Sequence, residues 1–119
     1  MTALESGALY AELERLSRAA GVRVAVATQE NDGLVLHAAG SDPARAPAAA
    51  ALGAALFARA RAAAAAQDHG DVQFLRVQCA AGQLLAASAG GAIVVLIAAA
   101  DSNAGRIRLE LLRAAGEFS

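Results

Sequence analysis

The chain has 119 residues and a formal net charge of −1, with ten basic and eleven acidic residues, three Phe, one Tyr and no Trp. One domain with a single core is the organisation expected at this length. A nucleic-acid-binding protein carries a basic face with stacking aromatic side chains, so the composition excludes that class of partner. The single cysteine, Cys79, cannot form a disulfide within the chain, and no secretion signal is evident, so we expect a cytoplasmic protein.

The first forty residues predict a helix followed by a β-hairpin. Thr2 and Glu5 have the spacing of a capping box at the start of the helix. The apolar positions that follow at helical spacing are Leu9, Leu13 and Leu16. Residues 22–29 then alternate as a strand does, 31–33 (Asn-Asp-Gly) supply a turn, and 34–39 form the returning strand.

The remaining residues predict a long helix, three strands and a last helix. The Ala-rich segment 44–67 is helical, with Pro47 in its first regular turn, where proline is tolerated. Three apolar runs separated by glycine-containing turns follow, at 72–79, 83–89 and 92–100. The last of these runs is apolar at nearly every position, which indicates a central strand covered on both faces.

The uncharged stretch 77–100 is long enough to cross a bilayer as a helix. Gly82 and the pair Gly90-Gly91 divide it into short pieces, so strands explain it better and we expect no membrane insertion. The element order is then α-β-β-α-β-β-β-α over a single domain. The simplest fold with this order is an α/β (α+β) one, a five-stranded antiparallel sheet with helices on both faces.

A strand, a turn of small residues and a helix meet at 101–105, as they do in phosphate-binding loops. The chain has no G-x-x-x-x-G-K-[ST] motif and no Lys to reach a phosphate. We therefore expect Asp101 or Ser102 to cap the last helix, and Gly105 to let that helix approach the sheet. No nucleotide or other cofactor is expected.

No other cluster of residues assembles a catalytic or metal site. Asp68, His69 and Asp71 lie where a helix must end, and His37 lies on a strand with no evident partner. Cys79 has no neighbouring basic residue and is expected to be a small buried side chain. The sequence predicts no metal, no catalytic residues and no enzyme activity.

Several stretches resemble the Roadblock/dynein light-chain-seven family, in its bacterial MglB-like branch. In the second half of the chain these are Gly70-Asp71, Gly82 with Leu84-Leu85, residues 91–96 and residues 101–111. In the first half they are Gly21-Val22 and residues 32–36. The most specific piece, 101–111, looks like the family's ending of Asp, Ala-Asn-Leu-Gly and an Arg-x-Glu-Leu helix.

The resemblance implies the fold deduced above and a homodimer that continues the sheet across the third strand and pairs the second helices. It also implies a non-enzymatic regulator or scaffold of a Ras-like small GTPase of the MglA type. Two alternatives stay open: a dimeric scaffold without a GTPase partner, and a small-molecule sensor with an apolar pocket.

The second helix is the strongest candidate for an interface. Helical periodicity puts Leu52, Gly53, Leu56, Phe57 and Ala60 toward the sheet. The opposite side is an alanine stripe flanked by two arginines: Ala51, Ala55, Ala58, Arg59, Arg61, Ala62 and Ala65. Such a stripe either reflects alanine-rich composition or allows a second helix, from the dimer mate or from a GTPase, to approach closely, with the arginines at the rim.

The strand 72–79 is the second candidate. If it is a sheet edge, as the resemblance implies, its backbone can pair with a symmetric partner. The alternate residues assigned to this dimer edge are Val72, Phe74, Arg76 and Gln78. Dimerisation is also expected on physical grounds, because 36 of the 119 residues are Ala and bury little apolar surface each.

Overall fold

The computed structural model describes residues 3–116, and side chains from residue 7 onward. The capping box at Thr2 and Glu5 therefore lies outside the described side chains. The elements in chain order are α1 (Ala3–Ser17), β1 (Val22–Gln29), β2 (Val35–Gly40), the 3₁₀ turn η1 (Pro43–Arg45), α2 (Ala46–Ala66), β3 (Phe74–Cys79), β4 (Gly82–Ala89), β5 (Ala92–Ala98) and α3 (Ala104–Gly116).

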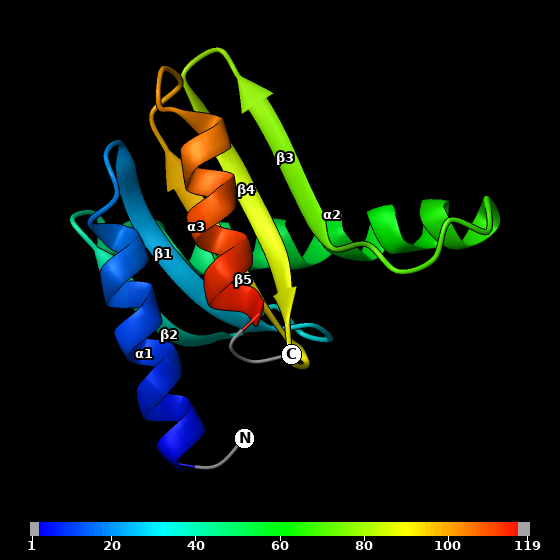
Figure 1. The fold of residues 1–119 in the computed structure, drawn as a ribbon, viewed down its shortest axis with the longest axis horizontal. Coiled ribbons are helices and arrows are strands. Elements are labelled where there is room, and N and C mark those ends of the chain that lie inside the picture. The colour runs from blue at the N-terminus through cyan, green and yellow to red at the C-terminus, as the bar shows by residue number, and fades with distance from the viewer. Residues whose placement is uncertain (1–2, 117–119) are drawn as a thin grey trace.

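The five strands form one antiparallel sheet in the order β2-β1-β5-β4-β3, with α1 and α3 on one face and α2 crossing the other (Figure 1). This confirms the predicted fold. The central strand β5 is buried on both faces, as its apolar run indicated. Under α1 and α3 the core contains Leu9, Leu13, Leu16, Leu96, Ile107 and Leu111. Under α2 it contains Val24, Val26, Phe57, Leu84 and Val95.

Three local expectations were wrong. The last helix is capped by Asn103, whose Oδ1 accepts a hydrogen bond from the Arg106 N–H at 3.1 Å, and not by Asp101 or Ser102. Gly105 is exposed, so it does not bring α3 close to the sheet. Cys79 is exposed, because it ends the edge strand β3 at a hairpin.

A buried glutamine holds the start of α3 against the sheet. Gln83, on β4, is only 3% exposed, and its amide group donates to the carbonyl oxygens of Ala99 at 3.0 Å and Ser102 at 3.1 Å. Its Oε1 accepts a hydrogen bond from Arg76 Nε at 3.0 Å. The side chain thus ties the β5–α3 connection to β4 and β3, since every polar atom of this buried amide has a partner.

The stretch that first raised the possibility of a membrane helix, 77–100, forms the end of β3 together with β4 and β5. Among the described residues, the one helical segment long and apolar enough to cross a membrane is Pro43–Ala66. It includes η1 and α2, which packs across the sheet. Within this chain, only 28% of the most apolar part of the segment is buried.

Candidate interaction surface

The inner face of α2 is built from small residues and one aromatic ring. Its buried residues are Ala46, Ala49, Ala50, Gly53, Ala54 and Phe57. Leu52, predicted to face the sheet, is instead 52% exposed. Leu56 and Ala60 are half-buried. The side of α2 that faces the sheet is therefore turned about the helix axis from the predicted side, away from Leu52 and toward the smaller residues.

Gly53 explains why small residues face the sheet. A Cβ atom at this position would lie 2.4 Å from Val95 Cγ2, which is far inside van der Waals contact. The helix backbone therefore rests directly on the central strand β5. With so little space between helix and sheet, alanine fits at the neighbouring inner positions and a leucine does not.

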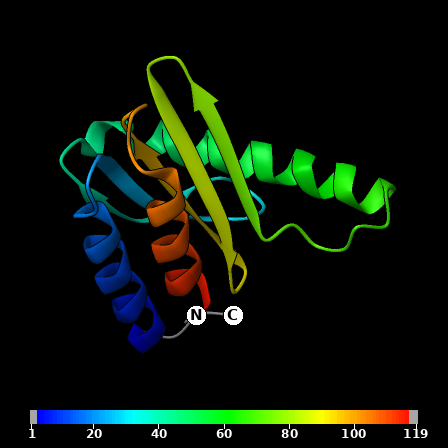
Figure 2. The same ribbon diagram turned by 45° about the horizontal axis from the view of Figure 1, so that its top comes forward.

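The outer face of α2 is exposed throughout. We use this name for Ala51, Leu52, Ala55, Ala58, Arg59, Ala62 and Ala65, all of which are exposed in the protomer. The alanine stripe predicted from the sequence therefore points away from the sheet. The helix also continues well past the edge strand β3, so that its last turns have no strand of this protomer beneath them (Figures 1 and 2).

Strand β3 lies at one edge of the sheet and pairs only with β4 among the described strands. Its outer edge therefore presents backbone N–H and C=O groups to solvent. The strand begins at Phe74, so Val72 precedes it and packs on the α2 side of the sheet. Phe74, Arg76 and Gln78 alternate onto the α3 side, where Arg76 hydrogen-bonds Gln78 and Gln83.

The two arginines of α2 differ in their surroundings. Arg61 was predicted to lie at the rim of an interface, but its guanidinium contacts its own protomer. Nη1 lies 2.6 Å from Glu30 Oε1, Nε lies 3.3 Å from Asp71 Oδ1, and the guanidinium carbon lies 4.9 Å from the Phe57 ring centroid. Arg59 is exposed and has no ion pair within the described residues. Arg61 therefore fixes α2 to the β1–β2 turn and to the segment before β3, whereas Arg59 is available to a partner.

We expect Arg61→Ala and Arg59→Ala to separate these roles. Arg61→Ala should lower the free energy of unfolding by about 1 kcal/mol, because it removes partly buried ion pairs. Arg59→Ala should leave stability within about 0.5 kcal/mol of the original and weaken partner binding, with less salt dependence. Urea unfolding and binding titrations at two salt concentrations measure the two effects. Equal stability losses in the two variants would contradict the assignment.

A shallow groove of about 230 Å³ runs beside the outer face of α2. Ala51, Ala55 and Ala58 line one side, and the turn from Glu30 to Gly33 lines the other. A Cβ on Gly33 would lie only 3.3 Å from the Ala51 Cα, so the small residues of α2 also let this turn pack closely. Part of the alanine content of α2 is thus explained within the protomer.

The described residues contain no group of three or more His, Cys, Asp or Glu side chains that could hold a metal ion. Asp68 has a positive φ of 57° and lies in the turn just after α2. The sequence also predicted the end of the helix here. His37 does have a partner, since its ring meets that of Tyr10 edge-on with centroids 5.8 Å apart. Neither arrangement resembles a catalytic site.

Comparison with known proteins agrees with this architecture. The pattern that describes the Roadblock/LC7 domain matches residues 9–99. The chain is similar to a Roadblock/LC7 domain from Streptomyces avermitilis, with 28% identity, coverage of 92% of this chain and 90% of that chain, and a TM-score of 0.78. No curated protein matches the sequence.

Two MglB structures are also similar in fold. Myxococcus xanthus MglB has 22% identity, a TM-score of 0.84, and coverage of 98% of this chain and 89% of that chain. An MglB described as having a tetrameric arrangement has 24% identity, a TM-score of 0.85, and coverage of 99% of this chain and 90% of that chain.

Proposed function

Because the chain belongs to the Roadblock/LC7 domain family, which is regulatory and non-catalytic, we propose that it is a homodimeric regulator of a Ras-like small GTPase of the MglA type. The observation that carries the proposal is the uncovered outer face of α2 beside the unpaired edge of β3. Because α2 continues past β3, a single protein partner can contact both features at once.

In the proposed dimer, two β3 strands pair across a two-fold axis. Figure 2 shows that α2 extends past β3, so in this dimer we expect its end to cover the partner's sheet. The alanines of the outer face make a different contact in this proposal, since their small side chains let the α2 helix of a second chain lie close alongside. Burial of the second helix also adds the apolar surface that an alanine-rich core lacks.

The GTPase in this proposal binds its own nucleotide, and the present protein acts by contact. The loop before α3 matches no phosphate-binding motif, and the chain has no Lys. Arg59 supplies a cation at the border of the outer face, where a charge tunes association rate and specificity. A GTPase partner also puts the protein in the cytoplasm, where GTP is available.

The test is GTP turnover by a purified Ras-like GTPase from the same genome, with and without this protein. We expect binding together with an increase in turnover of about tenfold or more. If the GTPase binds but its GTP turnover does not change, the protein is a scaffold for the GTPase and not its activator. No binding and no rate change with any such GTPase would contradict the GTPase proposal and leave a dimeric scaffold.

A further inference from the structure

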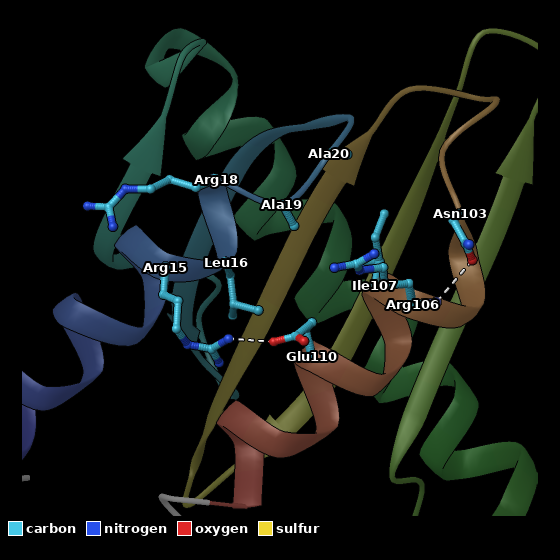
Figure 3. Close-up of a pocket in the computed structure, with 9 residues that line it drawn as sticks. All are labelled: Arg15, Leu16, Arg18, Ala19, Ala20, Asn103, Arg106, Ile107 and Glu110. Carbon is cyan, nitrogen blue, oxygen red and sulfur yellow. Dashed lines mark hydrogen bonds and ion pairs between the residues drawn. The ribbon is translucent and has the colours of Figure 1, made fainter.

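A cleft separates the end of α1 from the first turns of α3, on the face of the sheet opposite α2 (Figure 3). It has a volume of about 440 Å³ and opens to solvent. Its polar lining consists of Arg15, Arg18, Asn103, Arg106 and Glu110. Leu16 and Ile107, both almost fully buried, give it an apolar floor.

The cleft has more hydrogen-bond donors than acceptors. Its one carboxylate, Glu110, already accepts from Arg15 Nη1 at 2.5 Å, and Figure 3 shows these two side chains pointing toward one another between the helices. Asn103 Oδ1 is occupied by the Arg106 N–H, which leaves the amide NH₂ as a donor. The Arg106 guanidinium has no ion pair within the described residues.

The other charged side chains around the cleft do not remove its excess of hydrogen-bond donors. Arg15 also contacts Glu12 at 2.7 Å, so that both carboxylates near it are taken. Arg18 points away from the cleft in Figure 3, and its contact with Glu14 is a loose 3.8 Å with the arginine side chain 75% exposed. Arg106 therefore remains the cation that faces the cleft without an ion pair among the described residues, and Glu110, one helical turn further on, acts on it only at longer range.

The lowered pKa of Glu110 indicates a positive electrostatic potential in the cleft. Its pKa is held below the ordinary value chiefly by the hydrogen bond from Arg15, with Arg113 and Arg106 acting in the same direction against desolvation. A carboxylate at this place is thus stabilised in its charged form. Arg106 acts in this direction without an ion pair to Glu110, so its charge can also attract a second carboxylate.

We propose that this cleft docks an acidic segment of a partner protein, with a carboxylate on Arg106 and the segment's methylene groups on Leu16 and Ile107. A glutamate or aspartate side chain supplies the acceptor that Arg106 and Asn103 lack, together with apolar surface for the floor. The site lies on the face that the proposed dimer and GTPase contacts leave open. It therefore stands independently of the function proposed above.

The experiment follows amide chemical shifts of the ¹⁵N-labelled full chain during titration with a ten-residue glutamate peptide with blocked ends. We expect saturable shifts centred on residues 15–20 and 103–110, which weaken as salt shortens the Debye length. Arg106→Ala should weaken binding about tenfold, and Arg106→Lys should recover part of the loss. Arg59→Ala, an exposed helical arginine on the other face, is the matched control and should bind as the original chain does.

Four outcomes would overturn the proposal. The first is an absence of saturable shifts in the cleft at millimolar peptide, and the second is equal binding by Arg106→Ala. The third is equal binding of a glutamine peptide of the same length, which would show that charge is not recognised. The fourth is equal binding of inorganic phosphate at the same residues, which would make the cleft a general anion site. Because Arg106 is exposed, its replacement should leave the fold and the amide spectrum unchanged. A change in peptide binding can then be attributed to the missing guanidinium.

Discussion

The Ala58→Glu variant should fold as the original protomer does but self-associate at least about a hundredfold more weakly. Ala58 is exposed on the outer face of α2 and borders the open groove beside the turn from Glu30 to Gly33, so a longer side chain there has room and points away from the sheet. In the proposed dimer, its carboxylate would be buried without a partner, which costs several kcal/mol. Circular dichroism checks the fold, and sedimentation equilibrium measures the dimer dissociation constant.

Two controls separate charge and position from general damage. Ala58→Gln has nearly the same size without the charge and should weaken the dimer less than Ala58→Glu. Ala11→Glu makes the same change at an exposed position of α1 and should leave the dimer unchanged. If Ala58→Glu self-associates as tightly as Ala11→Glu, the outer face of α2 is ordinary solvent-exposed alanine and the interface lies elsewhere.

The second large effect is expected at Gly53. Helix propensity alone would make Gly53→Ala more stable by about 1 kcal/mol. The Cβ would however lie 2.4 Å from Val95 Cγ2, and forcing α2 away from β5 costs about 1–3 kcal/mol. We expect a net loss of up to about 2 kcal/mol in the free energy of unfolding, measured by urea denaturation.

Gly7→Ala is the matched control, because Gly7 also lies inside a helix, α1, but has no atom within 4 Å of the added Cβ. This variant should be more stable by about 0.5–1 kcal/mol. The opposite signs of the two changes test the close contact between α2 and β5. A gain in stability for Gly53→Ala equal to that of Gly7→Ala would contradict it.

The fold was predictable because strand and helix periodicities are strong where the apolar residues are large. The alternation of apolar and other residues in β1, and the spacing of the leucines in α1, predicted both elements to within a few residues of their observed bounds. The class of the sheet followed from the order of elements alone. The edge position of β3 rested on the family resemblance, since an edge strand differs from a central one mainly in having a less apolar sequence.

The orientation of α2 was harder to predict, for a physical reason. In a helix composed mostly of alanine, the few large residues decide the predicted face, and these pointed to Leu52. The observed face is decided by the close approach of α2 to β5 at Gly53, where alanines and the buried Phe57 fit and Leu52 does not. A pattern that assigns every large apolar residue of a helix to the core therefore places Phe57 correctly and Leu52 wrongly, because helix and sheet are nearly in contact.

Other features depend on geometry that the sequence does not show. The ion pairs of Arg61 with Glu30 and Asp71 join parts of the chain that are far apart in sequence, so the helical pattern of α2 did not reveal them. The donor-rich cleft likewise needs α1 beside α3 before Arg15 and Arg106 can line one cavity. Asn103 and Ser102 are both good capping residues, and only backbone geometry selects Asn103.

The most direct test of the central claim, that the β3 edge and the outer face of α2 join two protomers, is the mass of the protein in solution. Light scattering after size exclusion at tens of micromolar should give about twice the 11.8 kDa mass of the chain. A uniform mass of one chain at that concentration would contradict the account.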